Sequence, residues 1–144
     1  MSVQFRLKGM RRSNEMCVSL SYGNFHTLRE ALAEAIGFKE WIERQKSSMK
    51  KALFGEPFPE PPQMTWGYWA TGFDAFCNSC DCEGSIPMKD MDSLAHLLGA
   101  VSCIRPFRYD SNKSSDWTWL DRTRGDLRWL VDEGVKTNKP LVWD

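Results

Sequence analysis

The sequence has no excess of charge of either sign. Its 144 residues include 19 lysines and arginines and 19 aspartates and glutamates, which gives a formal net charge of zero at pH 7. A dedicated binder of nucleic acid or of an anionic membrane usually carries a basic field that attracts phosphates. The balance therefore argues against nucleic acid as a partner.

The sequence also lacks a long apolar run. Residues 1–8 have no apolar stretch of the kind found in signal peptides, and no later segment approaches the roughly 20 apolar residues of a membrane span. We therefore expect a cytoplasmic protein without a membrane segment. A chain of this length can bury its own core, so we predict a single domain, residues 1–144, in which a stiff proline-rich spacer occupies residues 55–62.

Histidine is scarce, since only His26 and His96 are present. Covalent catalysis needs a nucleophile beside a base such as histidine, and neither histidine lies in a recognisable nucleophile motif. A glycine-rich phosphate loop of either common spacing is also missing. The sequence leaves enzymatic activity open, favours a protein that is not an enzyme, and identifies no catalytic residue.

Three of the five cysteines lie in the segment Cys77–Gly84. Their odd number and their crowding favour reduced thiols over the disulfide framework of a secreted protein. The spacing Cys77-x-x-Cys80 would let two thiolates share a zinc ion, although one such pair is a weak signal. The candidate zinc ligands are Cys77, Cys80, Cys82, Cys103 and His96. We expect no cofactor, and a zinc-stabilised interaction module is an alternative.

Two carboxylates stand among these thiols. Asp81 and Glu83 would raise the pKa of the neighbouring thiols, so a redox dithiol is a weaker interpretation than zinc. The same carboxylates could bind a hard cation or the amines and hydroxyls of a ligand. The favoured interpretation is that they cap the helix that is predicted to follow.

A second polar segment, Ser21–Arg29, leads into a predicted helix and could hold an anion at its N-terminus. Tyr22, His26 and Arg29 are its candidate binding residues. If this segment lies beside Asp81 and Glu83, the two could form the polar pocket of a small enzyme or of a nucleotide-binding protein. A capped turn would explain the segment equally well.

The chain contains seven tryptophans, which is many for its length. Most should fill the core, because an indole buries a large area. Some could form a binding surface, since tryptophan is enriched at interaction hot spots. Trp66 and Trp69 are the candidates for that surface.

The apolar pattern predicts three strands. Val3, Phe5 and Leu7 alternate with polar residues, and residues 16–20 can pair with them as a hairpin. Residues 141–143, introduced by Pro140, should return to this N-terminal sheet.

Helical spacing predicts the remaining elements. The first helix is capped by Asn24 and ends at Gly37. Arg29 is predicted to lie outside the apolar stripe that faces the core. The predicted stripe is Leu28, Leu32, Ala35 and Ile36. Further helices are predicted from Phe38 to Leu53, within residues 66–76, from Pro87 to Val101, and up to about Gly134. The fold class is α+β, with a small antiparallel sheet from the N-terminal hairpin and the C-terminal strand packed with about four to five helices.

Several segments resemble a family of small uncharacterised bacterial and phage proteins. Asp81-Cys82-Glu83-Gly84, followed by an apolar residue, a proline and a leucine-rich helix, is similar to its Ser-Asp-Cys-Asp/Glu-Gly run. Ser21–Arg29 and Asn138–Trp143 are similar to its other recurrent segments, so the resemblance covers both ends and the middle of the chain. It implies a small cytoplasmic α+β protein and carries no assigned activity.

The chain departs from the family pattern at Ser79 and Cys80, which stand where the family has histidine and serine. This departure weakens a catalytic role for the segment and a shared zinc site. The leading hypothesis is a non-enzymatic binding protein, a phage or prophage accessory that engages a host protein or a small ligand, for example to inhibit host defence.

Overall fold

The computed structural model describes residues 1–45, 67–100 and 114–144. The elements are β1 (Ser2–Leu7), β2 (Val18–Ser21), α1 (Tyr22–Ala35), α3 (Ala70–Cys77), β3 (Gly84–Ser85), α4 (Met88–Ala100), α5 (Ser114–Thr137) and β4 (Leu141–Trp143). Residues 39–45 are also helical. The predicted α+β fold is confirmed. The proline-rich spacer at 55–62, Trp66 and Cys103 lie outside the described residues.

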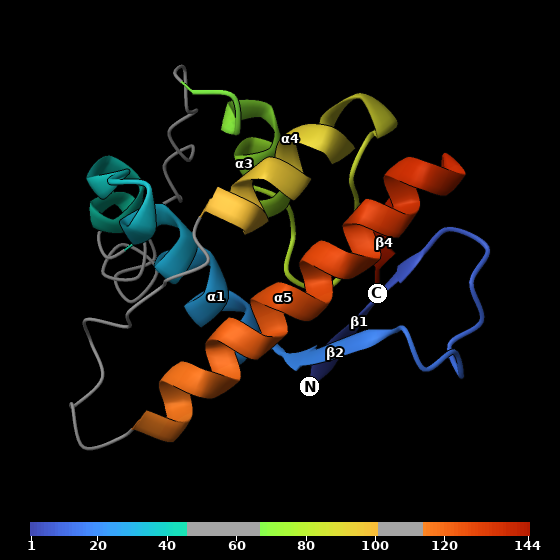
Figure 1. The fold of residues 1–144 in the computed structure, drawn as a ribbon. Coiled ribbons are helices and arrows are strands. Elements are labelled where there is room, and N and C mark those ends of the chain that lie inside the picture. The colour runs from blue at the N-terminus through green and yellow to red at the C-terminus, as the bar shows by residue number, and fades with distance from the viewer. Residues whose placement is uncertain (46–66, 101–113) are drawn as a thin grey trace.

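The four strands form one antiparallel sheet in the order β2-β1-β4-β3. Figure 1 labels three of them, β1, β2 and β4. Phe5 is opposite Val18 on one side and Trp143 on the other, so the predicted hairpin and the closing strand are both confirmed. Val3, Phe5 and Leu7 are at most 3% exposed, whereas the residues between them are partly exposed. The alternation therefore turns one face of the sheet to the core.

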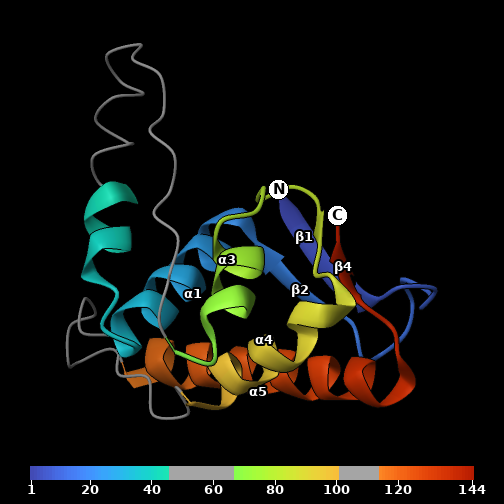
Figure 2. The ribbon, with the colours of Figure 1, turned by 90° about the horizontal axis from the view of Figure 1, so that it is seen from above.

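The helices close over that buried face. The long helix α5 runs beside both α4 and the sheet, and α3 packs against α4 (Figure 2). Under the sheet, four rings pack with centroids 5.0–6.0 Å apart, which fastens β1, α1, α3 and β4 together. These rings are Phe5, Phe25, Phe76 and Trp143.

Helix α1 begins earlier than predicted. Ser21 is its cap and accepts a hydrogen bond from the Asn24 N–H at 3.1 Å, so Asn24 is not the cap. The earlier start changes the buried stripe, because Phe25 and Arg29 face the core while Ala35 is exposed. Gly37 follows the helix with a φ of +77°, as its position after the apolar stripe predicts.

Contrary to the prediction, the cysteine segment does not lead directly into α4. β3 intervenes and pairs Gly84 with Trp143 and Ser85 with Val142. Glycine is required there, because a Cβ on Gly84 would lie 2.5 Å from Trp143 Cε2. The expectation that Asp81 and Glu83 cap this helix is therefore wrong. At the other end of the chain, α5 continues to Thr137, beyond the predicted end near Gly134.

An ion pair between Arg6 of the central strand β1 and Asp144, which follows the central strand β4, gives a testable pH dependence. Arg6 donates to both carboxylate oxygens of Asp144, at 2.6 and 3.0 Å, and Arg12 approaches the same group. The hydrogen bond from Arg6 lowers the pKa of Asp144, an effect that burial opposes. A lowered folded-state pKa stabilises the protein above the unfolded pKa, and this gain is lost as the pH falls through the folded value.

We therefore expect Asp144→Asn to lower the free energy of unfolding by less than about 1 kcal/mol at pH 7, because the pair is solvent-screened. Denaturant unfolding of both proteins, repeated as a pH series, measures the difference. The difference should vanish in acid strong enough to protonate Asp144 in the folded protein. A difference that persists there would mean that the carboxylate charge is not its source.

Candidate functional site

The loop between α3 and β3 is held in place by a buried arginine. Arg29 of α1 is 3% exposed, and its guanidinium lies over the Phe25 ring, 3.7 Å from the centroid. Its Nε donates to the Phe76 carbonyl at 3.0 Å and its Nη2 to the Ser79 carbonyl at 2.9 Å. Its Nη1 pairs with the Asp81 carboxylate. All three nitrogens are thus engaged by the loop and by the end of α3.

Two buried tryptophans hold the same loop. Trp41 Nε1 donates to Asn78 Oδ1 at 2.7 Å, and Trp143 Nε1 donates to the Cys80 carbonyl at 3.1 Å. Each of these side chains is 1% exposed. Residues 78–81 are therefore fixed by partners from three other parts of the fold, which makes the loop's conformation a product of tertiary structure.

The three cysteines of this segment do not converge. Cys77 is 4% exposed within the core, and burial raises the pKa of its thiol to about 12. Cys80 and Cys82 are exposed, with their sulfur atoms 2.8 Å apart. Across residues 1–45, 67–100 and 114–144, no group of three histidine, cysteine, aspartate or glutamate side chains is placed to hold a metal. His96 contacts Asp92 within its own helix and stacks edge-on against Tyr68.

The two polar segments predicted to form a pocket do lie together, through the Arg29–Asp81 pair. The Arg29 guanidinium already binds Phe76, Ser79 and Asp81, and its burial lowers its pKa. His26 lies 3.0 Å from Glu30 on the same helix, and Glu83 is exposed. Tyr22, half-buried, packs against the core. The ion pair that joins the two segments fixes the loop, so this contact supplies no open polar cavity.

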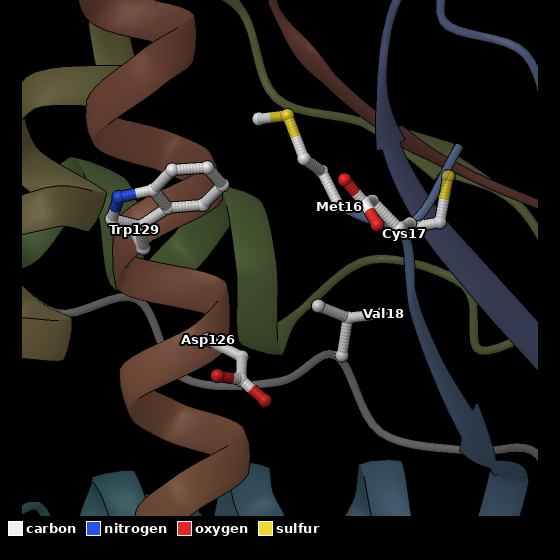
Figure 3. A pocket seen from close by; sticks show the side chains of 6 residues that line it. Met16, Cys17, Val18, Asp126 and Trp129 are labelled. Carbon is white, nitrogen blue, oxygen red and sulfur yellow. The ribbon is translucent and has the colours of Figure 1, made fainter.

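A different site lies between α5 and the chain leading into β2. A cleft of about 330 Å³, which we call the α5 cleft, is lined by Glu15, Met16, Cys17, Val18, Asp126 and Trp129. Figure 3 shows Trp129 and Asp126 projecting from α5 opposite the side chains of Met16, Cys17 and Val18. Its wall combines apolar and aromatic side chains with the two carboxylates of Glu15 and Asp126. Of the predicted site residues that the structure describes, none lines the α5 cleft.

Trp129 is the main exposed aromatic residue of this cleft. Its side chain is 53% exposed, and Trp119, on the same helix, is 37% exposed. By contrast, Trp41 and Trp143 are core residues, and Trp69, one of the predicted binding residues, is half-buried at the start of α3. The sequence did contain a signal for Trp129, because helical spacing puts it opposite the apolar stripe that includes Leu120 and Leu127.

No family model, no curated protein and no solved structure matches this chain. Among the helices of the described residues, none is both long enough and apolar enough to cross a bilayer.

Proposed function

We propose that this chain is a non-enzymatic binding protein, and that its α5 cleft receives a basic side chain of a protein partner. The observation that carries the proposal is the exposed indole of Trp129 beside the carboxylate of Asp126. An exposed indole is more typical of a binding surface than of a surface that contacts only solvent, because tryptophan is enriched among the residues that dominate binding at interfaces.

The chemistry of the α5 cleft favours a cation with an aliphatic stem. The faces of tryptophan rings attract guanidinium and ammonium groups, and carboxylates pair with them. Met16 and Val18 would contact the stem of an arginine or a lysine. A volume of about 330 Å³ is at the lower end for ligand pockets, which suits one side chain better than a cofactor.

A protein is the favoured source of that cation, because α5 exposes a second tryptophan, Trp119, outside the cleft. A free small ligand would use only the cleft. The resemblance at Asp81–Gly84 and at the two ends of the chain supports a cytoplasmic phage or prophage accessory. In that setting the partner is a host protein, for example a component of host defence.

The alternative of a small enzyme or nucleotide-binding protein is supported less well. It needs Arg29 and Asp81 to face a ligand, and these two groups pair with each other. The alternative of a zinc-stabilised module needs Cys77 beside Cys80 and Cys82, whereas Cys77 is in the core. Both alternatives would require the loop to rearrange against Arg29, Trp41 and Trp143.

The binding of a capped Gly-Arg-Gly peptide tests the proposal. Chemical shifts of the tryptophan indole N–H groups should follow the titration, with the Trp129 resonance assigned by its loss in Trp129→Phe. We expect Trp129→Leu and Asp126→Asn each to weaken binding about fivefold, which corresponds to about 1 kcal/mol.

The matched control is Trp119→Leu, which removes an exposed indole from the same helix outside the cleft and should leave the peptide affinity unchanged. Equal losses at Trp119 and Trp129 would indicate non-specific stacking. An affinity that is unaffected by either cleft substitution would refute the proposed site.

A further inference from the structure

Beyond the α5 cleft, the exposed pair Cys80 and Cys82 forms a second site with its own chemistry. Their sulfur atoms lie 2.8 Å apart, against about 2.05 Å in a disulfide. Both side chains are exposed, so a reagent in solution can reach them. A bond between them requires only a small movement of one sulfur.

The fold holds this pair together. The Cys80 carbonyl accepts a hydrogen bond from Trp143, the preceding carbonyl accepts one from Arg29, and Asp81 pairs with the same arginine. On the other side of the pair, Gly84 is fixed to β4. The backbone that carries the two thiols is therefore clamped at both ends by buried residues, while the thiols face solvent.

The two thiols differ in their surroundings. The pKa of Cys80 is lowered, first by the hydrogen bond from the Cys82 side chain and then by backbone hydrogen bonds from Cys82 and Glu83. The pKa of Cys82 is raised, first because its thiol serves Cys80 as a donor. The sequence alone predicts that the carboxylates raise both pKa values. In the folded loop, the donors that surround the Cys80 sulfur outweigh the charge of Asp81.

We propose that Cys80 and Cys82 form a thiol–disulfide exchange site, in which Cys80 attacks a low-molecular-weight disulfide and Cys82 resolves the product. The Cys80 thiolate attacks one sulfur of the co-reactant, whose S–S bond breaks and whose other half leaves as a thiol with the proton that Cys80 lost. The Cys82 thiolate then attacks Cys80 Sγ, and the second half leaves in the same way. Two protein thiols are oxidised to one disulfide, and one external disulfide is reduced to two thiols.

The site is suited to exchange because its bridge would be reversible. Disulfides that are exposed or strained are reduced more readily than buried structural ones. A bridge between residues separated by one position closes a small ring, and it would remain on the surface. Its opening and closing would leave Cys77 untouched in the core.

Incubation of the reduced, full-length protein with oxidised and reduced glutathione tests the proposal. After acid quenching and alkylation, peptide mass mapping should find a Cys80–Cys82 disulfide in the wild type. In Cys82→Ser, glutathione should remain attached to Cys80. In Cys80→Ser, Cys82 should take up glutathione at least about fivefold more slowly, because the backbone N–H groups of Cys82 and Glu83 favour a thiolate at position 80, whereas Cys82 remains beside the charge of Glu83.

The same rates measured in guanidinium provide the control. Once the loop has unfolded, Cys80 and Cys82 should take up glutathione at similar rates. The difference in rate between the two cysteines should exist only in the folded protein. Circular dichroism confirms that both serine variants fold. Equal rates in the folded variants, or glutathione on both cysteines of the wild type without an internal bridge, would overturn the proposal. Neither result depends on peptide binding at the α5 cleft.

Discussion

Replacing Gly72 by alanine is expected to lower the free energy of unfolding by about 3 kcal/mol, near the upper end for an overpacked core. Gly72 is a point of close approach between α3 and α4. An added Cβ would lie 2.6 Å from Leu94 Cα and 2.7 Å from the Ser93 carbonyl carbon. Both are backbone atoms, so the helices must move apart. That movement also strains the hydrogen bond from the Gly72 N–H to Ser93 Oγ, which is 2.8 Å long.

The matched control is Gly125→Ala in α5, where an added Cβ meets nothing within 4 Å. Alanine is preferred over glycine inside a helix, so this variant should be about 0.5–1 kcal/mol more stable than the wild type. Urea denaturation of the two variants gives both values. If both substitutions change stability by the same amount and in the same direction, α3 and α4 do not make this close contact.

Arg29→Met is expected to lower the free energy of unfolding by about 2–3 kcal/mol. Methionine keeps much of the side-chain length but donates no hydrogen bond, so the carbonyls of Phe76 and Ser79 lose their donors. The contact between the guanidinium and the Phe25 ring is lost as well. Urea denaturation measures this loss. We also expect the substitution to increase the rate of amide hydrogen exchange, relative to the wild type, more in the loop, residues 78–83, than in α5.

Asp81→Asn separates the ion pair from the rest of the Arg29 network. The Asp81 side chain is 52% exposed, so the pair is screened by solvent, and its loss should cost less than about 1 kcal/mol. The stability of the loop would then depend mainly on the bonds from Arg29 to the two carbonyls. A larger loss in Asp81→Asn than in Arg29→Met would contradict that division.

The regular elements could be predicted because their patterns are local. The two-residue alternation of Val3, Phe5 and Leu7 specified β1, and Gly37 marked the end of α1. Pairing of the chain ends could be predicted too, since residues 141–143 had the composition of a strand and needed a partner. The residues that identify each of these elements lie within a few positions of one another, although β1 and β4 pair across nearly the whole chain.

The burial of Arg29 could not be predicted, because its partners are distant in the sequence. Its hydrogen bonds reach carbonyls 47 and 50 residues away, and helical spacing alone placed it outside the apolar stripe. β3 was missed for a related reason. It has only two residues, too few for a period, and it exists because Gly84 lets the indole of Trp143 lie against the backbone.

The α5 cleft was missed because it joins two segments that lie far apart in the chain. The pattern predicts a strand over residues 16–20, although β2 begins only at Val18, and a helix up to about Gly134. Nothing in either pattern shows that side chains of the two segments meet. The cysteine segment, by contrast, stands out by its composition alone. The loop it forms holds Cys80 and Cys82 together, while Cys77 is packed in the core.

If the α5 cleft binds a positively charged side chain, it should distinguish arginine from citrulline. Citrulline has nearly the same shape as arginine but no charge. In titrations followed by the Trp129 indole resonance, the capped Gly-Arg-Gly peptide should bind at least about fivefold more tightly than its citrulline counterpart. Equal affinities, or no shift of the Trp129 resonance with either peptide, would contradict the account.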